Sequence, residues 1–326
     1  MTSLLRRLAA IVGWLTLIMA VAGLTWAAGV EGWSDHWGAT DDEVAATLPG
    51  DDLIEDPAMV TTRAVTVAAP PELVWPWIAQ FGQGRGGLYS YDWLERLFGL
   101  EIASVDTILP GEQDIAVGDQ IWITQPGYPA DLGLVVAALE PGRSLVLASS
   151  TPDRPSAPEE APWTWTFVVR PDGDGGTRLI VRNRNATVGA FGDVVWDRIV
   201  GPIGFAMERR TILGIDQRAE AGGGADVAPD WREPLWFAAL LVTGLAVLAI
   251  IATRAPPARR VTYVVAFTAA ATLVLFRFPS PWWSVALEAT GTFVAVVLWR
   301  PWPPGGRVDR RRVRSAADDR LLTSRR

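Results

Sequence analysis

The chain has 326 residues, of which 49% are apolar, and a formal net charge of −7. This length accommodates one domain of ordinary size with additional segments, and the apolar content indicates that some of these segments are embedded in a membrane. Cysteine is absent, which excludes disulfide bonds, thiolate metal sites and a cysteine nucleophile.

Charge is distributed unevenly along the chain. Between residues 29 and 233 there are 32 acidic residues and 14 arginines, a net charge of −18. An acidic domain is a poor match for nucleic acid, because phosphate binding requires clustered positive charge. We therefore expect no nucleic-acid partner. All 29 basic residues are arginine, which we interpret as the codon bias of a GC-rich bacterial genome.

An uncharged run of 21 residues, Leu8 to Ala28, follows Arg6 and Arg7. It is long enough to span a hydrocarbon core of about 30 Å at about 1.5 Å per residue. A membrane anchor and a secretory signal peptide both fit this pattern. The run is longer than the usual apolar core of a signal peptide and lacks a good small-x-small cleavage site, so we predict an anchor over residues 1–28.

Residues 29–58 are polar and acidic, and we predict a segment that links the anchor to the domain or wraps around it. Trp33 and Trp37 lie in this segment. They either sit at the membrane interface, where tryptophan is enriched, or pack on the domain. The domain itself is predicted over residues 59–222.

The stretch from Val65 to Gly99 organises this domain. Pro70 and Pro71 mark the start of a helix, and Pro76 keeps that helix short or irregular. The glycine-rich run 82–87 predicts a turn with positive φ angles and a close approach of the backbone. It lacks the Gly-Lys-Ser/Thr ending of a P-loop and a βαβ context, which argues against a phosphate-binding loop.

A short amphipathic helix follows the glycine turn, and we expect Ser90 to cap it. In one interpretation its buried face is apolar, while Asp92 and Glu95 are solvated. The apolar residues of that face are Trp93, Leu94, Leu97 and Phe98. The second interpretation, a binding site beside the turn, depends on a family resemblance.

Two phrases carry this resemblance. They are Ala-Pro-Pro-Glu-Leu-Val-Trp-Pro-Trp over residues 69–77 and Gly-Gln-Gly-Arg-Gly-Gly-Leu-Tyr-Ser-Tyr-Asp-Trp-Leu-Glu over residues 82–95. Together they resemble the polyketide cyclase/dehydrase and lipid-transport group of the START-like (SRPBCC) superfamily, from about Thr62 to Ala221. The resemblance implies an α+β helix-grip fold, in which a curved antiparallel sheet of about seven strands grips a long C-terminal helix over an apolar pocket. It implies no particular chemistry, because function lies in the site rather than in the fold.

The resemblance also implies a ligand entrance near the glycine turn. On this basis we predict eight ligand-binding residues: Trp75, Arg85, Tyr89, Tyr91, Asp92, Trp122, Trp165 and Met207. The implied ligand is a hydrophobic small molecule or a lipid. We expect no cofactor and no metal.

Alternating apolar and polar residues predict about seven strands. The first covers residues 59–67, and the weakest covers residues 101–109. The others are residues 120–124, 132–139, 144–149, 163–170 and 177–183. Four residues of the penultimate strand share one face, which predicts a deep apolar concavity: they are Trp163, Trp165, Phe167 and Val169. Periodicity leaves open whether this concavity is a filled core or a cavity.

The long final helix is predicted within residues 192–221, with a kink or its true start at Gly201 and Pro202. Its approximate apolar stripe comprises Trp196, Ile199, Ile203, Ala206, Met207, Leu213 and Ile215. Glu208, Arg209 and Arg210 interrupt the stripe, either as a polar group that faces the pocket or as an ion-paired shoulder.

Three further apolar segments, residues 234–253, 261–276 and 282–299, bring the prediction to about four transmembrane helices. A basic tail, residues 300–326, follows. Arginine clusters at both termini place the termini in the cytoplasm of a bacterial cell and the acidic domain outside the cell membrane.

These observations predict a membrane-anchored protein that binds or transfers a hydrophobic small molecule or lipid in an apolar pocket. The first alternative is a cyclase or dehydratase in which Asp92, Glu208 or a tyrosine acts as acid or base. The second alternative is an interaction module of a cell-envelope complex, which a filled core without a cavity would favour. The sequence shows only isolated acids and no catalytic constellation, so binding ranks above enzyme activity.

Overall fold

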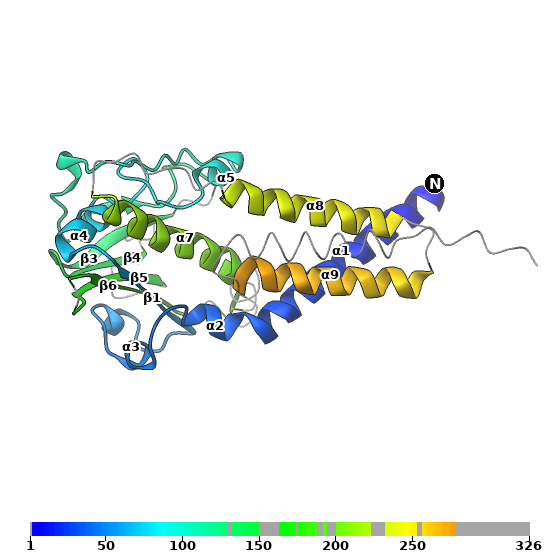
Figure 1. Ribbon diagram of the computed structural model, residues 1–326, viewed down its shortest axis with the longest axis horizontal. Helices are drawn as coiled ribbons and strands as arrows, with labels where there is room; N and C mark the ends of the chain where they lie inside the picture. The colour runs from blue at the N-terminus through cyan, green and yellow to red at the C-terminus, as the bar shows by residue number, and fades with distance from the viewer. Residues whose placement is uncertain are drawn as a thin grey trace, which may run out of the picture.

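The computed structural model describes residues 2–129, 132–149, 163–173, 175–187, 189, 192–193, 200–222, 232–252 and 256–277. An α+β domain lies at one end of the molecule, and three long helices extend from it (Figure 1). These helices are α1 (Thr2–Gly29), α8 (Arg232–Ala252) and α9 (Pro257–Arg277). The fourth predicted membrane segment, residues 282–299, and the basic tail lie outside the described residues.

The domain is built on one antiparallel sheet of six strands in the order β1-β6-β5-β4-β3-β2. From β2 to β6 each strand pairs with the next one in the chain, and β1 closes the order beside β6. The strands are β1 (Met59–Val67), β2 (Gln120–Trp122), β3 (Gly133–Glu140), β4 (Ser144–Ser149), β5 (Trp163–Pro171) and β6 (Thr177–Asn185). Six of the predicted strands are therefore confirmed.

The strand predicted over residues 101–109 is wrong. The backbone N–H of Ser104 donates to a carboxylate oxygen of Asp92 at 2.6 Å, and that of Leu109 donates to Oε1 of Gln80 at 2.9 Å. Between them the N–H of Val105 donates to the carbonyl of Gly86 at 3.0 Å. Because these donors are satisfied by side chains and by the glycine turn, the segment needs no partner strand.

Helix α7 (Gly201–Glu220) lies across one face of the sheet with α4 (Pro71–Ala79), and α3 (Asp41–Ala45) lies on the other side (Figure 1). Proline occupies the first turn of both α4 and α7, as their sequences predict, because its missing N–H is not needed there. This pairing of an antiparallel sheet with a long final helix matches the predicted α+β helix-grip fold.

The buried face of α7 differs from the predicted stripe. Its buried side chains include Phe205, Glu208, Ile212 and Ile215, which recur every three or four residues, whereas Ile203 is 57% exposed. An acidic residue therefore occupies a core position. This is tolerated because, as described below, partners on the sheet meet the charge of Glu208.

The outer face of the sheet is covered by the segment that the sequence predicts as a linker. Three arginines of β6 hold it there. Arg178 pairs with Glu43 at 2.7 Å, Arg182 pairs with Asp51 at 2.7 Å, and Arg184 donates to the carbonyl of Ile54 at 2.7 Å. This segment contains α2 (Glu31–Asp35), α3 and the short η1 (Asp51–Leu53). The domain boundaries given above remain predictions.

Of the two alternatives for Trp33 and Trp37, the structure shows packing on the domain. Their rings contact Phe205 of α7 with centroid separations of 5.8 and 6.5 Å, and Trp26 of α1 contacts the same ring at 6.1 Å. A small aromatic cluster therefore joins the end of α1 to the helix of the domain.

Among the described residues, one helix is long and apolar enough to cross a membrane, where the sequence predicts about four. It is α1, over Leu4–Gly29. The second and third predicted segments correspond to the 21-residue helices α8 and α9, which pack together, and α9 also packs on α1.

Candidate functional site

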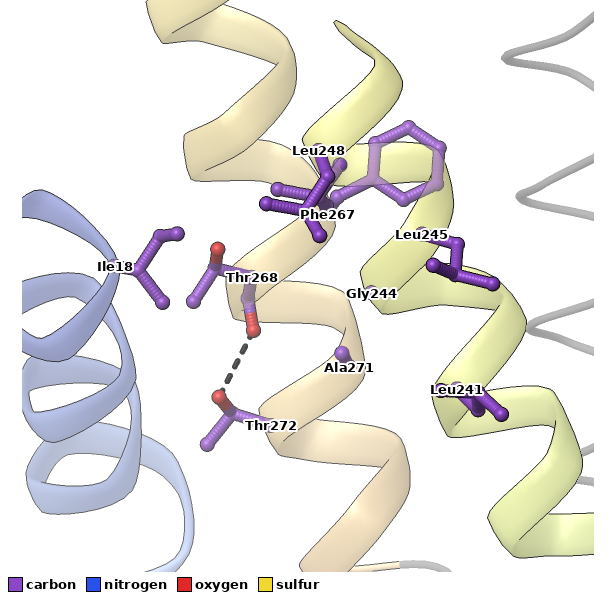
Figure 2. Close-up of a pocket in the computed structure, with 10 residues that line it drawn as sticks. Ile18, Leu241, Gly244, Leu245, Leu248, Phe267, Thr268, Ala271 and Thr272 are labelled. Carbon is purple, nitrogen blue, oxygen red and sulfur yellow. Dashed lines mark hydrogen bonds between the residues drawn. The ribbon is translucent and has the colours of Figure 1, made fainter. Parts of the chain in front are cut away.

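A cavity with a volume of about 490 Å³ lies between α1, α8 and α9. Figure 2 shows that side chains from the three helices surround it. No charged residue lines it. Its lining consists of Ile18, Leu241, Gly244, Leu245, Val247, Leu248, Phe267, Thr268, Ala271 and Thr272.

Small residues create this space. A Cβ atom added at Gly244 would meet nothing within 4 Å, and Ala271 lies on the facing helix (Figure 2). One of the two hydroxyl groups of the wall is satisfied within α9, because the hydroxyl of Thr272 donates to the carbonyl of Thr268 at 2.8 Å. The rest of the lining, apart from the second threonine, is apolar.

The space beneath α7, where the apolar pocket is predicted, is occupied by side chains in the part of the domain that the structure describes. The ring of Phe81 lies 5.2 Å from that of Trp165 and 5.6 Å from that of Phe167. Trp77 and Tyr89, also fully buried, lie 5.9 Å apart. Aromatic rings at these separations form a packed core.

One polar group interrupts this core, and we call it the Glu208 cluster: Arg63, Trp165, Asn183 and Glu208. Oε1 of Glu208 accepts hydrogen bonds from Nε1 of Trp165 at 2.7 Å and from Nδ2 of Asn183 at 2.5 Å. Its Oε2 pairs with Nη1 of Arg63. All four side chains are buried.

The chain positions the Glu208 cluster through the register of the sheet. Asn183 of β6 lies opposite Trp165 of β5, and Arg63 of β1 lies opposite the neighbouring Val181. The three donors thus come from adjacent strands and meet one carboxylate from α7. The carboxylate of Glu208 is thus engaged by three buried partners, of which the guanidinium of Arg63 is one.

Arg63 also joins the cluster to the segment that follows α1. Its Nε donates to the carbonyl of Ser34 at 2.7 Å, and its guanidinium lies 5.1 Å from the centroid of the Phe205 ring. Sequence reasoning missed Arg63 and Asn183 as members of this group. The available signal was a charged residue and an amide on the inward positions of otherwise apolar strands.

Around the glycine turn, Tyr89 is a core residue. It is 1% exposed, and its hydroxyl donates to the carbonyl of Trp77 at 3.1 Å. Burial raises the pKa of Tyr89. Its φ of 55° is in the left-handed region, a strained conformation for a residue with a side chain. The glycines of the turn behave as expected, since Gly82, Gly84 and Gly87 have positive φ.

Arg85 and Asp92 fasten the loop that follows. Arg85 pairs with Glu112 at 2.8 Å and donates to its carbonyl at 2.8 Å. Asp92 accepts from the backbone N–H and from the hydroxyl of Ser104 at 2.6 and 2.7 Å. Both predicted site residues therefore hold residues 101–113 against the glycine turn.

The remaining predicted site residues are partly buried: Trp75, Tyr91, Trp122 and Met207. Met207 adjoins Glu208 on α7, and its carbonyl accepts from the hydroxyl of Ser90 at 3.4 Å. Ser90 is thus not the cap of the following helix, α5 (Asp92–Leu97), whose N-cap is Tyr91. Of the eight residues, Tyr89 and Trp165 are buried in the core and Arg85 and Asp92 fasten the loop, and the assignment of the eight as ligand-binding residues stays a prediction.

Helix α5 has the opposite orientation from the one predicted. Glu95 is 4% exposed, whereas Trp93 is 44%, Leu97 73% and Phe98 67% exposed. Within the described part of the chain no hydrogen bond of normal geometry reaches the carboxylate oxygens of Glu95, and the nearby Ser90 and Tyr91 offset the effect of burial only in part. Burial raises the pKa of Glu95 to about 7.

Within the described residues, no three His, Cys, Asp or Glu side chains are grouped so that they could hold a metal ion.

No protein-family model and no curated protein sequence matches the chain. Solved structures similar to it include a Polyketide_cyc-like protein from Corynebacterium glutamicum, with 16% identity over 50% of this chain and 91% of that one and a TM-score of 0.28. The Aha1 dimer from Colwellia psychrerythraea is similar at 13% identity, over 51% of this chain and 99% of that one, with a TM-score of 0.29. A protein from Mesorhizobium loti has 16% identity over 50% and 98%, with a TM-score of 0.31. At these values the similarities carry no argument about activity or ligand.

Proposed function

We propose that this chain is a membrane-anchored protein that binds a hydrophobic small molecule or a lipid in the apolar cavity between α1, α8 and α9. The cavity is the observation that carries the proposal. Its volume of about 490 Å³ falls within the range of about 300–1,000 Å³ typical of ligand pockets. The absence of charged groups from its lining favours an aliphatic guest over a polar one.

The exposure of the helices supports a lipid environment. Leu15 and Met19 of α1 are 56% and 63% exposed, and Leu241, Leu245 and Leu248 of α8 are 56–65% exposed. In water, such a large apolar surface would be unfavourable at about 25 cal/mol per Å². The three leucines also line the cavity, so a guest could enter from the surroundings of the helices.

We extend the proposal to the topology. In it, α1, α8, α9 and the predicted segment 282–299 cross a bacterial membrane, with both termini in the cytoplasm and the START-like domain outside. The arginine clusters support this orientation through the positive-inside rule. A reporter fused after Ala221 and scored for periplasmic activity tests it.

The filled interior of the domain favours one alternative, an interaction module of an envelope complex. For the enzyme alternative, both candidate carboxylates and one of the tyrosines are engaged elsewhere. Asp92 and Glu208 are engaged in structural hydrogen bonds, and Tyr89 is buried in the core. None of these three residues lines the cavity.

The binding proposal is tested by filling the cavity. Gly244→Phe places a ring in the space beside Ala271. With the full chain in phospholipid nanodiscs, we expect photocrosslinking to a diazirine-labelled fatty acid to fall at least fivefold, with the crosslinked peptides of the unchanged chain mapping to α8 and α9.

Gly13→Phe is the matched control. Gly13 lies on α1, outside the cavity lining, and its position also has open space around it. It should leave crosslinking unchanged. Equal labelling of the Gly244→Phe chain and the control would overturn the cavity as the binding site.

A further inference from the structure

We propose that α5 is a second membrane contact, in which Trp93, Leu97 and Phe98 insert into the interface of the bilayer that α1 spans. This inference rests on the proposed function, because it requires the anchor. The partner that contacts this surface of α5 is the lipid bilayer itself rather than another protein or a second copy of the chain.

The first argument is the inverted amphipathicity of α5. Trp93 and Leu97 are four residues apart and share a helix face, and Phe98, the C-cap residue, is exposed beside the end of the helix. Glu95 lies on the opposite, inward face. Three large apolar side chains are thus exposed at the cost of burying a carboxyl group. Apolar residues with a tryptophan among them are typical of segments that lie in a membrane interface.

The second argument is the position of α5. It lies at the end of the domain from which the three long helices extend (Figure 1). The N-terminal end of α8 lies at the same level along the molecule (Figure 1). A bilayer that contains these helices would therefore have its surface near α5.

The third argument is that the carbonyls at the end of α5 are already satisfied. The hydroxyl of Tyr128 donates to the carbonyl of Phe98 at 2.8 Å, and Nε2 of Gln125 donates to that of Gly99 at 2.8 Å. Helix ends normally leave carbonyls for water to bond, and such groups are costly in a less polar medium. Here side chains of the same domain replace the water, so the apolar tip can enter the interface.

The negative charge of the domain indicates which force would hold α5 at the membrane surface. Arg96 is the one basic residue of α5, and residues 29–233 carry a net charge of −18. An anionic membrane surface would repel such a domain. The contact must therefore depend on apolar insertion, and it should depend little on salt.

The absence of cysteine allows a direct test. Three single variants, Leu15→Cys, Leu97→Cys and Val117→Cys, are labelled with an environment-sensitive fluorophore in the full chain. Each replaces an apolar residue that is 56–73% exposed. The chains are reconstituted in phosphatidylcholine vesicles with or without brominated acyl chains, which quench fluorophores that enter the bilayer.

We expect strong quenching at position 15, at least twofold quenching at position 97 that persists in 0.5 M salt, and less quenching at position 117, which is not part of α5. Quenching at position 15 but not at position 97 would overturn the inference while leaving the anchor intact, and it would point to a protein partner or a second copy. No quenching at position 15 would overturn the membrane anchoring on which both proposals rest. Equal quenching at positions 97 and 117 would also overturn the inference, because it would show unspecific adsorption of the domain.

Discussion

Two helices of the domain each bury a glutamate, and they do so in opposite ways. Glu208 of α7 is 5% exposed and meets an arginine, an indole and an amide. Glu95 of α5 is 4% exposed and has no such set of charged and polar partners in the described part of the chain. Polar partners compensate the burial of Glu208, whereas burial raises the pKa of Glu95.

The largest effect should come from removing the partner of Glu208. Arg63→Met leaves a buried carboxylate without its guanidinium, and we expect the free energy of unfolding to fall by about 3–5 kcal/mol. Denaturant unfolding of the full chain in detergent measures it. The double variant Arg63→Met with Glu208→Leu should regain part of the loss, since it removes the buried charge but leaves the donors of Trp165 and Asn183 without their acceptor. A double variant as unstable as the single one would contradict this explanation.

The next effect concerns Glu95. Its raised pKa of about 7, against an ordinary value of 4.5, means that the folded state keeps a proton that the unfolded state releases. The contribution of Glu95 to stability should therefore be undiminished below about pH 4.5, decline as the pH rises towards 7, and be lost above it. Glu95→Gln removes this dependence. Since one pKa unit corresponds to about 1.4 kcal/mol, the variant should be more stable than the unchanged chain at pH 8 by up to about 3 kcal/mol.

The decisive measurement for Glu95 is the difference in the free energy of unfolding between the unchanged chain and Glu95→Gln across pH 5 to 8. Other groups titrate equally in both chains and cancel in this difference. Asp216, whose pKa burial raises to about 6, is one of them. Parallel stability curves for the two chains would refute the role assigned to Glu95.

The smallest effect tests a paired carboxylate near the surface. The hydrogen bond from Arg178 is the main cause that lowers the pKa of Glu43 to about 2. The stabilisation by this pair is present above about pH 4.5 and is lost as the pH falls towards 2. Because the pair is partly exposed, we expect Glu43→Gln to cost about 1 kcal/mol at pH 7 and almost nothing near pH 2. Thermal unfolding at the two pH values measures this difference, and an equal cost at both would contradict it.

The sequence predicted the sheet well because alternation is a local property. Trp163, Trp165 and Phe167 face inward as their period of two requires. Helix α5 shows the limit of such reasoning. Its pattern places Trp93 and Leu97 opposite Glu95, but periodicity does not say which of the two faces is buried, and a helix of six residues gives no further signal.

The candidate sites were less predictable because they depend on contacts distant in the chain. Arg63 and Glu208 are 145 residues apart, so no spacing rule connects them. The cavity likewise arises from how three helices pack around Gly244. For these features the sequence shows which residue types are present, and only the tertiary structure shows which of them are in contact.

Arg63 has a mechanical consequence. Through Ser34, Glu208 and Phe205 it connects the residues that follow α1 to the centre of the sheet and to α7. If α1 tilts, these contacts should therefore move the sheet and α7 with it, as a flexible linker would not. The domain and the long helices should then melt together in a single calorimetric transition.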